Sequence, residues 1–454
     1  MSAKLHKISG LLNCSKRAFS AKAAPKIADR QQTTRVVKQT KLANGLLVVA
    51  VENDAPISRI GVYIRAGARF ETSENLGITH CLRNCAGLST TNSTIFGITR
   101  NVEHVGGFLT ATNTREDMVY KLGNIRDFTS QNLGYLADTV TRPAFKPWEI
   151  KDFKYRMEMD CERFKLNREA QLIESLHKVS FRGGLSNSLY TPDFKLGTHD
   201  HNTLMEYVMS NYLSSRMVVV GIGIDCGTLV DYVERNFTMN SGESKPISPS
   251  KFISGEIRVD DDSDICLAGI VTEGVSVKNS KDMVSLCLFQ HILGCGPRMK
   301  YNEGVSILSK AAKQASEKPS TVTALNISYS DSGLFGVTVA GHANDMDKLL
   351  KAVVGKMKEV SKSLKEEDLQ KAKLSLKASW HMALESDDTL LDEIGYQALN
   401  FGEALNLHDM EAAVDGITLK DLSAVTSKVM KGKPSMASIG KLHNTPYLED
   451  IVSM

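Results

Sequence analysis

The residues most suggestive of chemistry lie in a helix predicted over residues 76–88, LGITHCLRNCAGL. His80 and Asn84 are four residues apart and therefore point to the same face of that helix, with Arg83 beside them. A zinc peptidase uses this spacing to direct two histidines at one metal ion, next to a glutamate that serves as general base. In this chain the spacing is present, but an amide and a guanidinium occupy two of the three positions.

These residue types argue against a bound zinc ion. The neutral amide of Asn84 is a poor zinc ligand beside imidazole or carboxylate. Arg83 cannot take a proton from water, because a guanidinium stays charged in proteins. At about 6 Å and an effective dielectric of about 20, its charge would repel a dication by roughly 5–6 kcal/mol, of order 10⁴ in affinity. We therefore expect neither a metal site nor a catalytic site here.

A simpler interpretation of the same helix is structural. A single histidine such as His80 on a mostly apolar helix is more often a hydrogen-bonded core residue than a metal ligand. Cys81 and Cys85 lie on another side of the helix, so they do not converge with His80 on one ion. The eight cysteines of the chain include no CxxC pair and are most simply free thiols. We expect no cofactor in this chain.

The elements that would position this helix occur twice along the chain. Two strand-like runs, helices, a hairpin, long helices and an apolar strand fill the first half, and the order recurs after a polar stretch. Strands followed by helices, twice, predict two α+β domains, each a mixed, mostly antiparallel sheet with helices packed on one side. We predict an N-terminal domain over 39–238, a linker over 239–251 and a C-terminal domain over 252–454. A twofold repeat of roughly 200 residues indicates a duplicated domain and not a solenoid, whose period would be far shorter.

The N-terminus is basic and lacks acidic residues. No Asp or Glu occurs in the first 28 residues, and apolar residues fall there at helical spacing, which is typical of a mitochondrial presequence. We predict a presequence over 1–19 and a polar lead-in over 20–38; a disordered basic tail is the alternative. Removing four positive charges with residues 1–19 lowers the formal net charge from +3 to −1. A nearly neutral protein has no electrostatic footprint for nucleic acid.

No apolar run approaches the length of about 18 residues that a transmembrane helix needs. We therefore expect no direct membrane span, and any attachment to a membrane would come through a partner. The acidic run VDDDSD (259–264) lacks the alternating ligands and central glycine of a calcium loop, and it reads as a solvated turn.

The motif HCLRN (80–84), placed after the second strand, resembles the inverse H-x-x-E-H pattern of the pitrilysin/insulinase metallopeptidases. In that family two histidines and a downstream glutamate hold zinc, and the glutamate inside the motif is the general base. The resemblance puts His80 at the first ligand position, Arg83 at the general-base position and Asn84 at the second ligand position. It puts Asp160 at the third ligand position, with Glu158 and Glu162 as neighbouring candidates.

Other stretches narrow the resemblance within that family. They are ISYSDSGLFG (327–336), KLSLKASWHMALESDDTLLDEIGYQAL (373–399) and GKLHNTPYLEDI (440–451). All three resemble the non-catalytic core subunits of mitochondrial ubiquinol–cytochrome c reductase, respiratory complex III. The resemblance implies a structural subunit on the matrix side of the inner membrane, with haem and iron–sulfur cluster held by partner subunits. The partners it implies are core protein 1, cytochrome b, cytochrome c1 and the Rieske protein.

Two alternatives remain open at this stage. One is a subunit of a presequence-processing peptidase that binds presequence peptides while a partner supplies zinc. The non-catalytic subunit of that enzyme carries a long glycine-rich loop, where this chain has only GCGPRMKYNEGVS (294–306). The other alternative is a free matrix binding protein unrelated to respiration.

Overall fold

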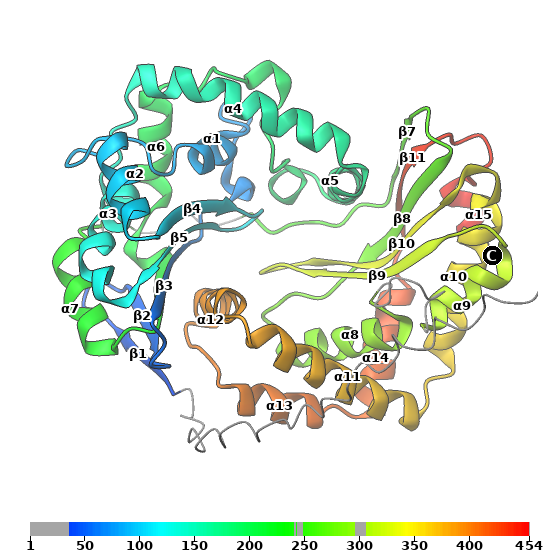
Figure 1. Cartoon of the computed structure of the whole chain (residues 1–454). Helices are drawn as coiled ribbons and strands as arrows, with labels where there is room; N and C mark the ends of the chain where they lie inside the picture. Colours follow the sequence, from blue (N-terminus) through cyan, green and yellow to red (C-terminus); the bar gives the residue numbers. More distant parts are fainter. Residues whose placement is uncertain (1–35, 240–241, 243–247, 296–305, 454) are drawn as a thin grey trace, which may run out of the picture. The chain divides into compact units, whose positions relative to one another are not determined.

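Two β-sheets organise the computed structural model, which describes residues 36–239, 242, 248–295 and 306–453 (Figure 1). The predicted presequence (1–19), most of the lead-in (20–38), much of the linker (239–251) and most of the GCGPRMKYNEGVS segment lie outside the described residues.

The first sheet has six strands in the order β1-β2-β6-β3-β5-β4. Every neighbouring pair is antiparallel except β2 with β6, which run parallel. The hairpin predicted from the sequence is formed by β4 and β5. The strands are β1 (Val37–Lys41), β2 (Leu47–Val51), β3 (Ile57–Ile64), β4 (Phe108–Asn113), β5 (Met118–Ile125) and β6 (Met217–Ile222).

The second sheet has five strands in the order β7-β11-β8-β10-β9. Only β7 and β11 pair in parallel; the other neighbours are antiparallel. The strands are β7 (Glu256–Asp260), β8 (Ile265–Glu273), β9 (Thr321–Ser328), β10 (Gly333–His342) and β11 (Ser435–Gly440). The predicted α+β class with two mixed, mostly antiparallel sheets is thus confirmed.

Helices follow the strands in both halves. Those of the N-terminal half are α1 (Ile78–Asn84), α2 (Ile95–His104), α3 (Thr129–Thr141), α4 (Pro147–Leu166), α5 (Arg168–Ser180), α6 (His201–Asn211) and α7 (Cys226–Asn236). Those of the C-terminal half are α8 (Ser280–Leu293), α9 (Ile307–Ala315), α10 (Met346–Lys362), α11 (Glu366–Leu384), α12 (Asp387–Phe401), α13 (Leu407–Asp415), α14 (Leu419–Met430) and α15 (Leu448–Val452).

One of the long helices expected in the first half, whose helical pattern runs over residues 147–178 of the sequence, is in fact two helices. Asn167 leaves the helical conformation (φ −95°, ψ 92°), and its side chain accepts a hydrogen bond from the backbone N–H of Ala170 at 3.0 Å. Because asparagine is a favoured N-cap residue, it ends α4 and starts α5 in a new direction. The apolar pattern continues across this point, which is why the sequence alone predicted one long helix.

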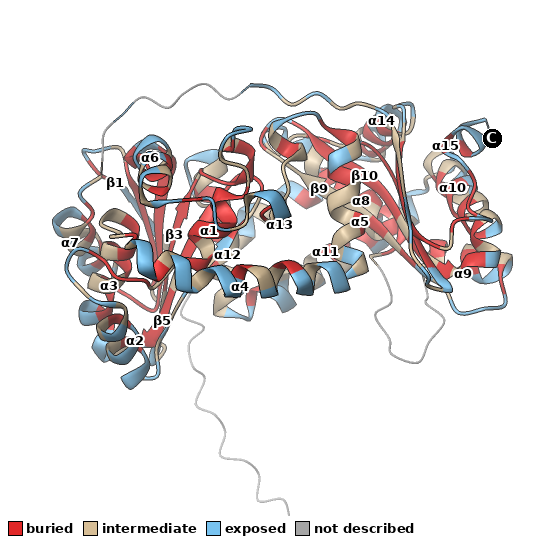
Figure 2. Cartoon of the chain, turned by 90° about the horizontal axis from the view of Figure 1, so that it is seen from above, coloured by how far each residue is buried: buried red, intermediate tan, exposed pale blue. Residues whose placement is uncertain are grey.

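Both faces of the central strands of each sheet are buried, whereas the edge strands β1 and β7 are largely exposed or half-buried (Figure 2). Successive residues of β2 point to opposite faces, yet Val48 and Val49 are each fully buried. One face packs on helices of its own half, as predicted. The structure adds one helix on the opposite face, and that helix comes from the other half of the chain.

This exchange of helices is reciprocal. In the first sheet, Leu391 and Ile394 of α12 pack in one apolar cluster with Val49 and Val220. In the second sheet, Leu172 and Leu176 of α5 join a cluster with Leu267, Val271 and Ile439. Each sheet therefore completes its core with a helix of the other half, so the two halves depend on one another for burial.

One glycine makes this close packing possible for α12. A Cβ atom at Gly395 would lie 2.4 Å from the ring of Tyr63 on β3. The absence of that atom lets the helix rest directly on the aromatic ring, and the Tyr63 hydroxyl donates to Asp392 at 2.8 Å. Lys121 of β5 also pairs with Asp392, at 2.7 Å.

Candidate functional site

The helix that carries the motif, α1, is fixed on its apolar side by the core of the first sheet. Ile78, Cys81 and Leu82 belong to the cluster that includes Val48 and Ile60. The helix begins after Gly77, which adopts a left-handed conformation (φ 82°), and a Cβ there would lie 2.5 Å from Thr191. Only glycine allows the start of α1 to approach Thr191 this closely.

Thr191 determines the protonation of His80. Its backbone N–H donates to His80 Nδ1 at 3.2 Å, and a backbone N–H can only donate. The imidazole proton is therefore on Nε2, which lies 3.5 Å from Asp160 Oδ2. Burial, followed by the positive charge of Arg83, lowers the pKa of His80 to about 4. The ring is thus neutral near pH 7, and its Nε2 lone pair is not available to a metal.

Arg83 forms an ion pair with Asp160 (Nη2 to Oδ2 2.7 Å). The same guanidinium donates to Asn113 Oδ1 at 3.2 Å and lies over the ring of Tyr190, 5.7 Å from its centroid. Burial alone would raise the pKa of Asp160, but the Arg83 guanidinium outweighs it and holds that pKa below its usual value. The arginine therefore supplies the positive charge that this carboxylate faces.

Asn84 presents its amide nitrogen to the site. Nδ2 donates to the carbonyl oxygen of His80 at 3.0 Å and lies 3.4 Å from Asp160 Oδ2. A metal ligand would have to present an oxygen or nitrogen lone pair at this place, and the amide presents hydrogens.

Zinc, which the motif's family would place here, does not fit these residues. A guanidinium neutralises the one carboxylate, the imidazole nitrogen nearest that carboxylate carries a proton, and the amide donates. No group of three or more His, Cys, Asp or Glu residues within the described ranges could hold a metal ion.

The structure brings together all four residues that the resemblance assigned to the site: His80, Arg83, Asn84 and Asp160. The neighbouring candidates on α4 point elsewhere, since Glu158 pairs with Lys154 at 3.7 Å and Glu162 with Lys165 at 2.9 Å. That these positions hold no metal and catalyse no reaction remains a prediction.

Three residues of the site were not found from the sequence: Asn113 at the end of β4, and Tyr190 and Thr191 in the loop between α5 and α6. None belongs to a recognisable local motif, and each reaches α1 only through the tertiary fold. An asparagine ending a predicted strand was the only local signal that could have drawn attention to any of them.

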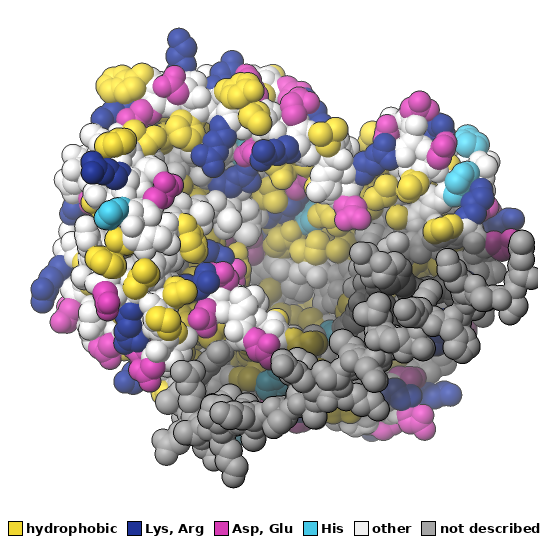
Figure 3. Space-filling view, viewed as in Figure 1, with side chains coloured by type: hydrophobic (Ala, Val, Ile, Leu, Met, Phe, Trp, Pro, Cys, Tyr) yellow, Lys and Arg dark blue, Asp and Glu magenta, His cyan; other side chains and the backbone are white. Residues whose placement is uncertain are grey.

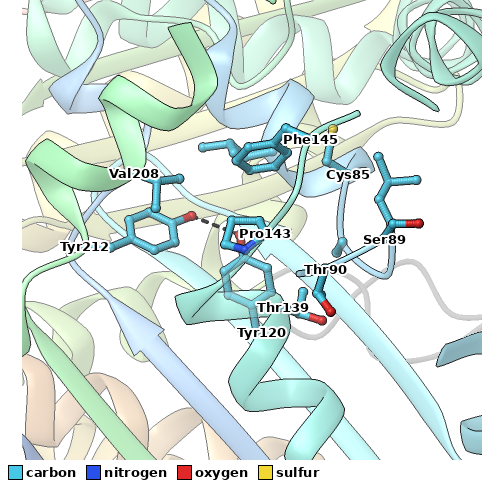
Figure 4. A pocket seen from close by; sticks show the side chains of 12 residues that line it. Cys85, Ser89, Thr90, Tyr120, Thr139, Pro143, Phe145, Val208 and Tyr212 are labelled. Carbon is cyan, nitrogen blue, oxygen red and sulfur yellow. Dashed lines mark hydrogen bonds between the residues drawn. The ribbon is translucent and has the colours of Figure 1, made fainter. Parts of the chain in front are cut away.

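Cys81 and Cys85 face away from this site. Both are buried free thiols whose sulfur atoms lie 4.0 Å apart. Behind them is a cavity of about 10 Å³, enough for one water molecule at most, near the Tyr120 and Tyr212 hydroxyls, which are hydrogen-bonded at 2.9 Å (Figure 4). This is a packing defect of the core and not a ligand site.

No helix among the described residues has the length and apolar character needed to cross a bilayer.

Comparison with known proteins gives a consistent set of relatives. Residues 47–193 match the model of "Insulinase (Peptidase family M16)", and residues 200–376 match that of "Peptidase M16 inactive domain". The chain is 35% identical to cytochrome b-c1 complex subunit 2 of Mus musculus, over 96% of this chain and 98% of that protein. It is 33% identical to the Homo sapiens protein of the same name, with the same coverage.

A second group of relatives is more distant. A probable mitochondrial-processing peptidase subunit alpha-2 of Arabidopsis thaliana is 27% identical, over 94% of this chain and 87% of that protein.

Proposed function

The chain belongs to the insulinase family, peptidase family M16, and we propose that it serves there as a structural subunit of mitochondrial ubiquinol–cytochrome c reductase, as core protein 2. The observation that carries the non-catalytic part of this proposal is the Arg83–Asp160 ion pair, which occupies the place of a metal and its general base. The relatives with the higher identity, matched over nearly their full length, favour this assembly over presequence processing.

The function of such a subunit is to bury interfaces. Within the complex the chain would pair with core protein 1 and contact the cytochrome b, cytochrome c1 and Rieske subunits from the matrix side, as a peripheral protein of the inner membrane. Obligate interfaces of this kind commonly exceed about 2,000 Å². Electron transfer would belong entirely to the haem and iron–sulfur groups of the partners.

Blue-native electrophoresis of solubilised mitochondria tests this assignment directly. We expect an antibody to the chain to detect it at the mass of the whole complex, together with cytochrome c1. Migration as a free species near its own mass of 49.8 kDa would contradict the proposal.

The alternative, a presequence-processing subunit, is tested by cleavage. The purified chain, alone and with its partner, is given a synthetic presequence peptide and zinc. We expect no cleavage that depends on this chain's α1 site, so Arg83→Leu should leave any residual activity of the pair unchanged.

A further inference from the structure

The outer side of α4 carries a stripe of large apolar side chains that the described part of the chain does not cover. Trp148, Tyr155, Met159 and Leu166 are 63%, 69%, 41% and 84% exposed. Their spacings of 7, 4 and 7 residues keep them on one line along the helix, the period of a helix–helix seam. Single exposed apolar residues are common, but an aligned set containing Trp and Tyr is typical of an interface.

The stripe continues into a groove at the end of α4. A hollow of about 730 Å³ is lined there by Leu166, Ile265 and Leu267, together with Arg163 and Arg168. Ile265 is itself 57% exposed. The apolar surface therefore extends from the helix onto the start of β8, and it is long enough to receive a helix of several turns.

Charge identifies the kind of helix that fits. Lys151, Arg156 and Arg163 flank the stripe, and none of them forms an ion pair with another described residue. The remaining charges on this face largely cancel, because Lys154 pairs with Glu158 and Lys165 with Glu162. Two acids at this face have no such pair within the described ranges: Asp152 beside the stripe and Glu169 at the groove. Arg168 at the groove pairs with Asp261 at 2.7 Å, so three unpaired cations face two unpaired acids. Figure 3 shows Lys and Arg side chains beside hydrophobic ones along the upper edge, over α4.

This net positive rim excludes two occupants. The chain's own N-terminal segment has no acidic residue in its first 28 positions, so it would be repelled, as would any basic presequence. A second copy that used the same face would bring the same cations together.

We propose that the face formed by Trp148, Tyr155, Met159 and Leu166, with the adjoining groove, docks an amphipathic helix of a partner subunit whose apolar stripe is flanked by acidic residues. The proposal rests on the proposed function, since that partner is a component of the respiratory complex. The aromatic residues anchor the contact, and the three unpaired cations select the partner's acidic flanks.

Thiol labelling in the assembled complex tests the docking. Tyr155→Cys is compared with Glu367→Cys, which replaces an exposed polar residue on α11. In the free chain both cysteines should react with a maleimide at similar rates. In the complex isolated by blue-native electrophoresis, we expect Tyr155→Cys to react at least about tenfold more slowly than in the free chain, because a docked helix excludes the reagent. Equal reactivity of the two sites in an intact complex would overturn the proposal.

Photo-cross-linking identifies the occupant. Benzoylphenylalanine placed at position 155 should cross-link, in the intact complex, to a helix with a net negative flank. A cross-link to a basic helix, to a second copy of this chain or to lipid alone would overturn the proposal. We expect Arg156→Glu with Arg163→Glu to reduce the cross-link about tenfold and the matched control Lys348→Glu, on α10, to leave it unchanged.

The two proposals fail in different ways. If the chain never migrates with the complex, the proposed function and the docking fail together. If it assembles normally while position 155 stays reactive and uncross-linked, only the docking proposal fails.

Discussion

Arg69 and Arg83 both face carboxylates in the N-terminal half, but they differ in what surrounds them. The Arg83 and Asp160 side chains are each 23% exposed, and both belong to the same half of the chain. The Arg69 side chain is only 2% exposed; it pairs with Glu116 of its own half at 2.7 Å and with Asp331 of the other half at 2.5 Å. Glu116 in turn accepts hydrogen bonds from the backbone and hydroxyl of Ser330.

The difference separates two uses of an arginine. The Arg69 guanidinium connects the two halves through Glu116 and Asp331, so its loss would leave the buried Glu116 carboxylate without compensation. Arg83 lies at the position that the family resemblance assigns to a general base, and water can reach both partners of its ion pair. We therefore expect the partly exposed Arg83–Asp160 pair to contribute little to folding stability. The buried Arg69–Glu116 pair, in contrast, should be needed for a stable fold.

The largest expected effect follows from reversing the charge in the motif. The double variant Arg83→Glu with Asn84→His rebuilds the H-x-x-E-H pattern beside Asp160. Removing the repulsion between a guanidinium and a dication should strengthen zinc binding by about 10⁴-fold, which competition with a chromogenic chelator can measure. Arg83→Leu with Asn84→His is the matched control, which removes the positive charge without adding the acid.

The rebuilt site still has one obstacle, the proton that Thr191 keeps on His80 Nε2. If neither double variant binds zinc at micromolar concentrations, then the orientation of His80, and not the charge of Arg83, is what prevents zinc binding. Residues that hydrogen-bond a metal ligand, as Thr191 bonds His80, change metal affinity by about 10–100-fold. We therefore expect Thr191 to reduce the gain in zinc affinity and not to abolish it.

Arg69→Met should have the largest effect on stability. Breaking a buried ion pair by removing one partner costs about 3–5 kcal/mol, because the Glu116 carboxylate stays buried. Urea unfolding of the purified chain would show this as a lower free energy of unfolding. Arg69→Met combined with Glu116→Gln should recover part of the loss; a loss below about 1 kcal/mol in the single variant would contradict the distinction between the two arginines.

The sequence predicted the repeated α+β fold because alternating and helical apolar patterns are local properties, and they recur in both halves. It did not predict that α12 and α5 are exchanged between the sheets. Leu391 and Leu172 have the pattern of any buried helix residue, and nothing in that pattern states which sheet they cover.

The same limit applies to the site. His80, Arg83 and Asn84 lie in one short helix, so their spacing could be read directly from the sequence. Asp160 required a family alignment by motif, with its register open to Glu158 and Glu162. The contact with Thr191 depends on a glycine at 77 and a loop far along the chain, and no local signal carries that information.

A second connection between the halves should respond to pH. His177 on α5 is buried, with Nε2 2.7 Å from the Tyr329 hydroxyl of the C-terminal half. Burial, together with the positive charge of Arg115, lowers the pKa of His177 to about 3. The unfolded chain takes up the proton near pH 6.5, so folding stability should fall as the pH drops from about 6.5 towards 3, at up to about 1.4 kcal/mol per pH unit.

Urea unfolding at pH 7.5, 6 and 5 measures this dependence in the native chain and in His177→Gln. The variant cannot bind the proton, so its stability should fall less than that of the native chain over the same interval. Parallel pH profiles would show that His177 is protonated equally in the folded and unfolded states. Burial would then not lower the pKa of His177.

The smallest effect is expected at Arg83 itself. Arg83→Leu removes an ion pair whose two side chains water can reach, and such pairs contribute about 0–1 kcal/mol. Because Arg83 lowers the pKa of Asp160, the contribution should be complete above the ordinary aspartate value of about 3.9 and should disappear as the pH falls through the lowered value. A double-mutant cycle with Asp160→Asn, measured by urea unfolding at pH 7 and pH 3, isolates the pair from the lost packing on Tyr190. A coupling energy above about 2 kcal/mol would show that the fold depends on the Arg83–Asp160 pair as it does on Arg69. The contrast between a buried, stabilising arginine and a partly exposed one would then be wrong.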